Sequence, residues 1–238
     1  MTSGIIMAAT TAITRNDRRA TRSITALLSL GFGLALTVLA LPQLAGEGCL
    51  WAAREGMLSK SAGPDQRPAL AGWLMQAGTL SRLAPALAEA GTTWLRLALE
   101  GRDDGVILLM DANQAFADSL ALAPAESLIW FRLSYSASRE GRSRDAARAW
   151  RMAILTGAFD PQMMEYRLGL GFSLWPYMEA AERAAMAHQL VTFWSWGPGT
   201  VSELTERDAA LDIVRLALAN RPDIVADIER RIALRQGK

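Results

Sequence analysis

Side chains that could carry out catalysis are scarce in this sequence. It has one cysteine, Cys49, and one histidine, His188. A lone cysteine cannot form a disulfide within its own chain, and a zinc site needs several Cys or His ligands at set spacings. His188 lies in the apolar helical stretch AERAAMAHQLVTFW, where a packed or half-exposed histidine is the usual outcome. Neither residue indicates a catalytic centre.

Two pairs of acidic residues have a spacing that could support general acid and base chemistry. Asp103 is followed by Asp104, and Glu203 precedes Glu206 by three positions. Acids in turns and in first helical turns more often remain solvated or stabilise the helix end. The sequence offers no nucleophile elbow, phosphate-binding loop or metal-ligand motif to accompany them. We therefore expect no enzymatic activity, no cofactor and no bound metal.

The charge distribution argues against nucleic acid as a partner. The chain of 238 residues is 51% hydrophobic and 21% charged, with a formal net charge of +1. Four arginines and one aspartate lie in the first 23 residues, so the remainder carries a net charge of −2. Phosphate binding requires clustered Lys and Arg, and no such stripe is present. The chain beyond the N-terminal region is nearly neutral and long enough for one domain with a core.

An apolar run near the N-terminus predicts a membrane anchor. Residues 24–41 read ITALLSLGFGLALTVLAL and directly follow the four arginines. About 18 apolar residues just span the hydrocarbon core, and flanking arginines resist translocation. Arginine also supplies all basic residues except Lys60 and Lys238, a bias typical of GC-rich bacterial genomes. We expect a single-pass inner-membrane protein with a cytoplasmic N-terminus and a periplasmic C-terminal domain.

The alternative to an anchor is a cleaved secretory signal. Signal peptides have a shorter apolar core, of about 7 to 15 residues, and small residues at the cleavage site. The sequence LPQLAG after the run offers no clean site of this kind. Within the run, Ser29, Gly33 and Thr37 recur every four residues. Small residues at this spacing let a second membrane helix approach closely.

The rest of the chain has the pattern of an all-α protein. From Ala69 onward the apolar residues recur at helical spacing, and no alternating run is long enough for a strand. Prolines at first helical turns and glycines at helix ends agree with this pattern. The expected helices are Ala69 to Ala77, Ser81 to Glu100, Gly105 to Leu122, Ala125 to Glu140, Ser143 to Thr156, Pro161 to Leu174, Pro176 to Trp194, Val201 to Asn220 and Pro222 to Arg235.

One helical pair has large, small and glycine residues at a regular spacing. In the sequence LIWFRLSYSASREGRSRDAARAWRMA, these positions are Trp130, Leu133, Gly141, Ala146, Trp150 and Ala153. They resemble the tetratricopeptide repeat (TPR), a helix-turn-helix of 34 residues, although Ser134 replaces the family's small glycine and Ala137 its tyrosine. Small residues let two antiparallel helices approach, and large ones fill the space between successive pairs.

Two weaker copies flank this unit. Downstream, Leu168, Gly169 and Phe172 match the pattern, although Glu165 stands where the tryptophan is expected. Upstream, Ala112, Phe116, Ser119, Leu120, Leu122 and Pro124 resemble a second repeat helix, after a helix that contains Trp94 and Leu97. The resemblance extends over residues 83–196 and is specific within 130–153. General packing of helical hairpins is the alternative explanation.

The resemblance implies a concave surface that is lined by the first helix of each pair and binds a peptide or protein. The residues that match groove-facing positions are Phe131, Tyr135, Arg139, Tyr166, Leu170 and Leu174. The alternative is that neighbouring helices cover Phe131 and Tyr135 as core, and that Arg139 is a solvated charge at a helix end.

A pair of tryptophans, Trp194 and Trp196, precedes the helix breaker Gly-Pro-Gly. Large amphipathic rings at a helix end are typical of docking sites for a partner or a membrane surface. The alternative is that both rings seal the end of the helix stack. The last two helices are expected to cap that stack, because the ends of repeat proteins need a cover.

These observations predict a membrane-anchored periplasmic scaffold, an accessory subunit that binds protein partners in an envelope complex. The first alternative is a subunit held in an integral complex mainly by its transmembrane helix, and an envelope enzyme is the less favoured one. The expected segments are a basic cytoplasmic tail (1–23), a transmembrane anchor (24–44), a juxtamembrane segment with short helices (45–82), TPR-like helical repeats (83–198) and a C-terminal capping helix pair (199–238).

Overall fold

A computed structural model describes residues 3–58 and 66–237 of the chain, with side chains for 27–56 and 66–237. The arginines of the basic tail lie outside the described side chains. Every regular element in these ranges is helical, as expected for an all-α protein. The elements are α1 (Ser3–Leu58), α2 (Arg67–Ser81), α3 (Ala84–Leu99), α4 (Gly105–Leu122), α5 (Ser127–Arg139), α6 (Ser143–Thr156), α7 (Pro161–Leu174), the 3₁₀ helix η2 (Trp175–Tyr177), α8 (Ala180–Trp196), α9 (Pro198–Arg207), α10 (Leu211–Ala217) and α11 (Pro222–Gln236).

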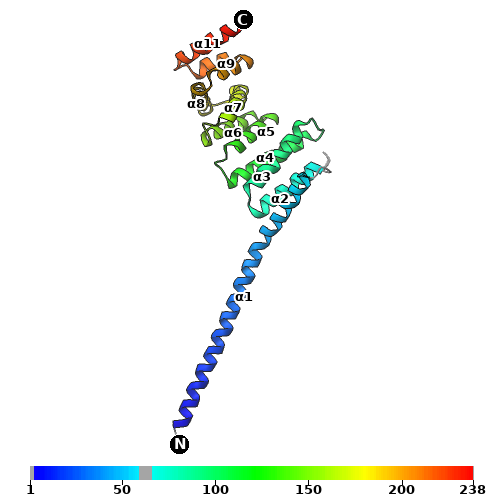
Figure 1. Cartoon of the computed structure of the whole chain (residues 1–238), viewed down its shortest axis with the longest axis vertical. Coiled ribbons are helices and arrows are strands. Elements are labelled where there is room, and N and C mark those ends of the chain that lie inside the picture. Colours follow the sequence, from blue (N-terminus) through cyan, green and yellow to red (C-terminus); the bar gives the residue numbers. More distant parts are fainter. Residues whose placement is uncertain (1–2, 59–65, 238) are drawn as a thin grey trace.

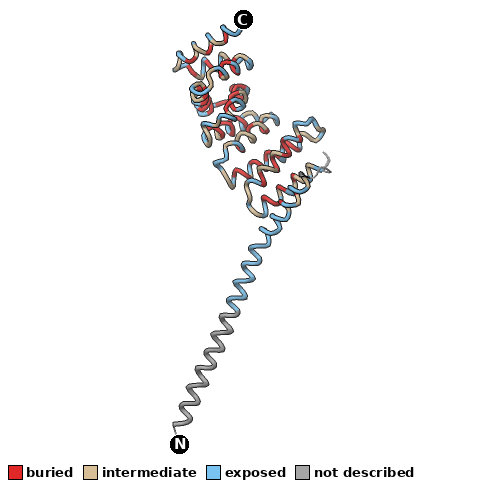
Figure 2. The backbone as a smooth tube through the Cα atoms, viewed as in Figure 1, coloured by how far each residue is buried: buried red, intermediate tan, exposed pale blue. Residues whose placement is uncertain are grey.

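Helix α1 projects as a rod from the rest of the molecule (Figure 1). Its segment Leu27–Gly56 contains an 18-residue stretch with a mean hydropathy of 1.9, and the helix is long and apolar enough to cross a membrane. Residues 27–45 are all exposed, which Figure 2 shows as an uncovered stretch below the packed helices. A signal sequence would meet the same criteria of length and composition.

The sequence predicted that the anchor ends near residue 44, but α1 continues through Pro42 to Leu58. Proline removes one helical hydrogen bond and usually kinks or ends a helix. Here the last turns of α1 are held by packing against α2. A Cβ added at Gly46 would collide with Ser81, and one at Gly56 would meet the Leu70 side chain. The end of α1, which lies in the segment predicted to be juxtamembrane, is therefore part of an antiparallel pair of helices.

Helices α2, α3 and α4 continue this antiparallel series. Helices α3 and α4 approach closely at Gly91 of α3, where a Cβ would lie 2.7 Å from the Phe116 ring of α4. Ser119 near the end of α4 donates a 2.9 Å hydrogen bond to the carbonyl oxygen of Ala84 at the start of α3. The first core cluster, which includes Leu74, Leu97 and Phe116, fills the space between α1, α2, α3 and α4.

A second core lies around Trp150 of α6, whose side chain is fully buried. Its indole Nε1 donates a 2.7 Å hydrogen bond to the carbonyl oxygen of Arg167 in α7. The Arg167 side chain is fully buried as well, and its guanidinium donates to Gly157 O at 2.5 Å and to Ser127 Oγ at 3.0 Å. A single arginine thus joins the start of α5, the end of α6 and α7.

The C-terminal third differs from the predicted helix bounds in two places. Pro176 lies in η2, and α8 begins only at Ala180, where Glu179 and Glu182 form a capping box. The helix expected over residues 201–220 is divided into α9 and α10, because Ala209 has a φ of +49°. A positive φ in a residue with a Cβ is incompatible with a continuous right-handed helix. Helix α11 packs on α9 and closes the end of the stack farthest from α1 (Figure 1).

Candidate functional site

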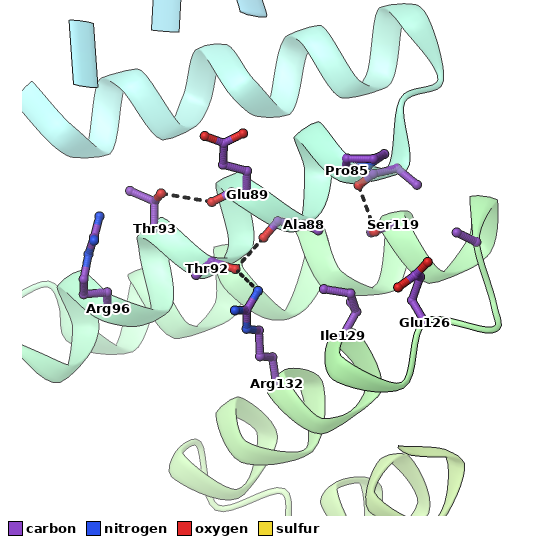
Figure 3. Close-up of a pocket in the computed structure, with 12 residues that line it drawn as sticks. Pro85, Ala88, Glu89, Thr92, Thr93, Arg96, Ser119, Glu126, Ile129 and Arg132 are labelled. Carbon is purple, nitrogen blue, oxygen red and sulfur yellow. Dashed lines mark hydrogen bonds between the residues drawn. The ribbon is translucent and has the colours of Figure 1, made fainter. Parts of the chain in front are cut away.

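A hollow of about 650 Å³ opens between α3 and α5 (Figure 3). Successive turns of α3 form one wall, and the N-terminal half of α5 forms the other. Its lining combines small apolar residues with hydroxyls and charged groups. The lining residues are Ala84, Pro85, Ala88, Glu89, Thr92, Thr93, Arg96, Ser119, Ala123, Glu126, Ile129 and Arg132.

Arg132 is the central polar group of this hollow. Its Nη1 donates a 2.8 Å hydrogen bond to Thr92 Oγ1, and Thr92 in turn donates to the carbonyl oxygen of Ala88 at 2.6 Å. Within the part of the chain that the structure describes, no carboxylate forms an ion pair with Arg132. Burial lowers the pKa of its guanidinium, which still remains protonated at neutral pH. Arg132 therefore presents a partly desolvated positive charge with N–H groups to spare.

The other charges lie around the edge of the hollow. Glu89 forms a 3.2 Å ion pair with Arg54 of α1, so its charge is compensated by that helix. Arg96 is exposed on the same side as Arg132, whereas Glu126 lies at the opposite end, beyond Ile129 (Figure 3). The hollow thus has a basic end, an apolar middle and an acidic end.

A second hollow, of about 340 Å³, lies on the other side of α5, between α5 and α7. An ion pair of 3.7 Å between Glu165 and Arg207 lies at its edge. Its main lining is apolar and aromatic, and consists of Phe131, Tyr135, Tyr166, Leu170, Gly169 and Ser173. The side chain of Tyr166 is 65% exposed, so the aromatic lining of this hollow is open to solvent.

Four of the six residues predicted for a partner groove meet in this second hollow: Phe131, Tyr135, Tyr166 and Leu170. Arg139 is exposed at the end of α5 and lies outside the hollow. Leu174 requires a correction, because it is only 1% exposed and belongs to the core around Trp150. As the last residue of α7, it leads directly into η2, whose Trp175 is buried in the same core.

The two tryptophans at the end of α8 have different surroundings. The guanidinium of Arg231 in α11 lies 5.5 Å from the ring centre of Trp194, which is partly buried against the core. Trp196 is 53% exposed and makes an edge-on contact with Phe159, with ring centres 6.4 Å apart. Trp194 therefore helps to seal the end of the stack, while Trp196 remains accessible.

The three small residues that were predicted to pack against a membrane helix are all exposed. Ser29, Gly33 and Thr37 are exposed, and Thr37 Oγ1 donates a 2.9 Å hydrogen bond to the carbonyl oxygen of Gly33. A Cβ added at Gly33 would meet no atom within 4 Å. Within the described residues, nothing covers this strip of α1.

The hollow between α3 and α5 was not among the predicted sites. Its signal in the sequence is a strip of small and polar residues on α3, in which Ala88, Thr92 and Arg96 follow one another at intervals of four. Residues at this interval share a helix face. Such a strip predicts an exposed face, but it does not reveal that Arg132 of another helix lies opposite Thr92.

No group of three or more His, Cys, Asp or Glu side chains that could hold a metal ion occurs within the described residues. Comparisons of the chain with protein-family models, with curated proteins and with solved structures found no match. The two hollows and the exposed length of α1 are therefore the features of the molecule that bear on its function.

Proposed function

We propose that this protein is a membrane-anchored scaffold that binds a partner protein along the exposed faces of α3, α5 and α7. Helix α1 would span a bacterial inner membrane with its N-terminus in the cytoplasm, and the helical domain would lie in the periplasm. The observation that carries the proposal is the pair of hollows on either side of α5, one polar around Arg132 and one aromatic around Tyr166.

The arrangement of the helices supports this proposal. Helices α3 and α4 pair, as do α5 and α6, and the first helices of successive pairs contact one another: α3 meets α5, and α5 meets α7. In a TPR-like solenoid, the first helices of the pairs line the binding surface. Both hollows lie on these helices, which is where the sequence resemblance implied a partner groove.

The chemistry of the two hollows indicates the kind of segment that would bind. The aromatic hollow fits apolar side chains, whose burial contributes about 25 cal/mol per Å² of area removed from water. The Arg132 hollow has free N–H donors for carbonyl or carboxylate oxygens. An extended protein segment with both kinds of group would contact both sides of α5.

Site-specific photocrosslinking in cells tests this proposal. A benzophenone amino acid replaces Tyr166, which is 65% exposed in the aromatic hollow, or Tyr177, which is 49% exposed in η2 and lies outside it. The proposal expects a discrete protein adduct from position 166 that disappears in a Phe131→Ala, Tyr135→Ala variant of unchanged melting temperature. Equal adducts from both positions, or an adduct that survives the double substitution, would contradict the groove.

A second candidate function is that of a subunit held in an integral complex by α1. The uncovered strip of Ser29, Gly33 and Thr37 favours it, since a neighbouring membrane helix can approach closely there. The two functions are compatible. A substitution at Gly33 tests whether α1 contributes to partner binding independently of the two hollows.

A further inference from the structure

The turn between α2 and α3 lies beside the point where the apolar rod of α1 enters the helical domain (Figure 1). Ser81 Oγ at the end of α2 lies 3.4 Å from the carbonyl oxygen of Gln43 in α1. The 20 residues from Ile24 to Gln43 extend about 30 Å as a helix, which equals the thickness of a hydrocarbon core. A membrane crossed by this stretch would therefore end at the level of Ser81.

The residues on either side of Ser81 have the character of a membrane-surface contact. Leu80 is 44% exposed, and Arg82 is exposed as well. Among the described residues, no acceptor binds the Arg82 guanidinium. An apolar side chain next to an arginine suits the membrane–water interface. The apolar side chain enters the boundary of the acyl chains, and the arginine reaches lipid phosphate.

Arg82 occupies a backbone conformation that is unusual for a residue with a side chain. Arg82 ends α2 in the left-handed region, with φ +51°, and its N–H bonds to the carbonyl oxygen of Gly78. Glycine is the usual residue at this position of a helix end, because a Cβ makes positive φ unfavourable. Arg82, whose guanidinium has no partner within the described residues, therefore occupies a position where glycine would fit the backbone better.

We propose that the α2–α3 turn is a second membrane contact, in which Leu80 and Arg82 lie on the periplasmic surface of the lipid bilayer. This inference rests on the proposed membrane span of α1. Because α1 is continuous and packs on α2, the two contacts fix the orientation of the domain. Ala84 and Pro85, which follow the turn directly, line the hollow between α3 and α5. That hollow consequently opens close to the membrane surface.

Depth-dependent fluorescence quenching tests the contact in the full-length protein. In a Cys49→Ser background, a single cysteine at Leu34, Leu80 or Leu234 carries an NBD probe. The protein is reconstituted in vesicles of phosphatidylethanolamine with a minor fraction of phosphatidylglycerol, whose phosphate, unlike that of phosphatidylethanolamine, is not balanced by an ammonium group. Leu34 and Leu234 are 65% and 64% exposed, so they are matched controls within the apolar run and on α11 at the far end of the molecule.

The expected result is strong quenching at Leu34 by deep spin-labelled lipids and quenching at Leu80 by shallow spin-labelled lipids. At Leu234 the probe should respond to aqueous iodide alone. Quenching at Leu34, with Leu80 behaving like Leu234, would overturn the surface contact and leave the anchor intact. A probe at Leu34 that responds to iodide would overturn the membrane span and, with it, the contact.

The Arg82→Gly variant distinguishes the contribution of the guanidinium to membrane contact from its contribution to stability. Glycine adopts positive φ freely, so the melting temperature should not fall. With the probe at Leu80, shallow quenching should decrease severalfold in this variant, and the decrease should be smaller in vesicles without phosphatidylglycerol, where an ammonium group balances each lipid phosphate. Unchanged quenching in anionic vesicles would overturn the assignment of Arg82 to lipid phosphate.

Discussion

The hydroxyl of Ser134 in α5 donates a 2.7 Å hydrogen bond to the carbonyl oxygen of Ala146 in α6, and both residues are fully buried. Two positions later, Ser136 Oγ donates a 2.5 Å hydrogen bond to Asn113 Oδ1 of α4. Small hydroxyl residues on α5 thus connect it to the helices before and after it. They allow a close approach and satisfy their own polar atoms in the core.

The contact at Ser134 predicts a large penalty for a bulky side chain. Ser134→Leu should lower the free energy of unfolding by about 1 to 3 kcal/mol or more, because overpacking forces α5 and α6 apart. Ser134→Ala should cost only about 1 kcal/mol, the net value of one hydrogen bond. Thermal unfolding of the full-length protein, monitored by circular dichroism, measures the stability change in both variants.

Ser173 on the exposed face of α7 provides the control for Ser134. Its hydroxyl bonds within its own helix, to the carbonyl oxygen of Leu170. Ser173→Leu should change the stability by less than about 0.5 kcal/mol, as is usual for surface substitutions. Equal effects of leucine at the two positions would show that α5 and α6 are not closely packed at Ser134.

The buried indole of Trp150 leads to a second prediction. Trp150→Phe retains most of the ring but removes the donor to the carbonyl oxygen of Arg167. It should therefore cost about 2 to 4 kcal/mol, from the lost hydrogen bond together with the cavity left by the smaller ring. Trp196→Phe, at a ring that is 53% exposed, is the matched control and should leave the melting temperature nearly unchanged.

The helical pairs could be predicted from sequence because their signals are local. The spacing of Trp130, Gly141 and Trp150 places a helix, a turn and a second helix, and the structure has α5 and α6 at these positions. Ser134 could be predicted as the small residue between them for the same reason. Periodicity reports which face of a helix is buried, and this determines most of the core.

Features that depend on tertiary packing could not be predicted in the same way. The continuation of α1 through Pro42 requires α2 to support it, and the break between α9 and α10 depends on the positive φ of Ala209. Leu174 has the spacing of an exposed residue, yet it leads into η2 and is buried. The partnership of Arg132 with Thr92 joins residues 40 positions apart, which no local pattern reveals.

The uncovered strip on α1 gives a third prediction. Gly33→Leu and Gly31→Leu both place a side chain where no atom of the described chain lies within 4 Å, so neither should affect the fold. The two positions are two residues apart and therefore face nearly opposite sides of the helix. If α1 binds a membrane partner through Ser29, Gly33 and Thr37, Gly33→Leu should abolish copurification in mild detergent, whereas Gly31→Leu should not. Equal yields from both variants would exclude this strip as the contact.

Acid should weaken the start of α11. The guanidinium of Arg221 donates two hydrogen bonds to the Asp223 carboxylate, at 3.1 and 2.9 Å, and holds the pKa of that carboxyl below its usual value. A depressed pKa in the folded state stabilises the protein above the unfolded-state pKa, and this stabilisation is lost as the pH falls through the folded-state pKa. Asp223→Asn should therefore lower the melting temperature slightly at pH 7, and its difference from the wild type should shrink at about pH 3. A constant difference across this range would contradict the ion pair.

The sharpest test of the site compares two arginines of α5. Arg132 is half-buried beside Thr92, whereas Arg139 is exposed at the end of the helix and lies outside both hollows. Arg132→Gln retains a donor for Thr92 but removes the charge, so the fold should be preserved while partner binding weakens.

A hydrogen bond to a charged group contributes about 1.5 to 3 kcal/mol, so its loss in Arg132→Gln corresponds to at least a tenfold loss of affinity for the partner. Arg139→Gln should leave binding within about twofold, since exposed charges contribute little. The yield of the adduct from the photocrosslinker at position 166 measures partner binding in both variants. A greater loss of binding in Arg139→Gln would contradict the Arg132 hollow and place the binding surface nearer the end of α5.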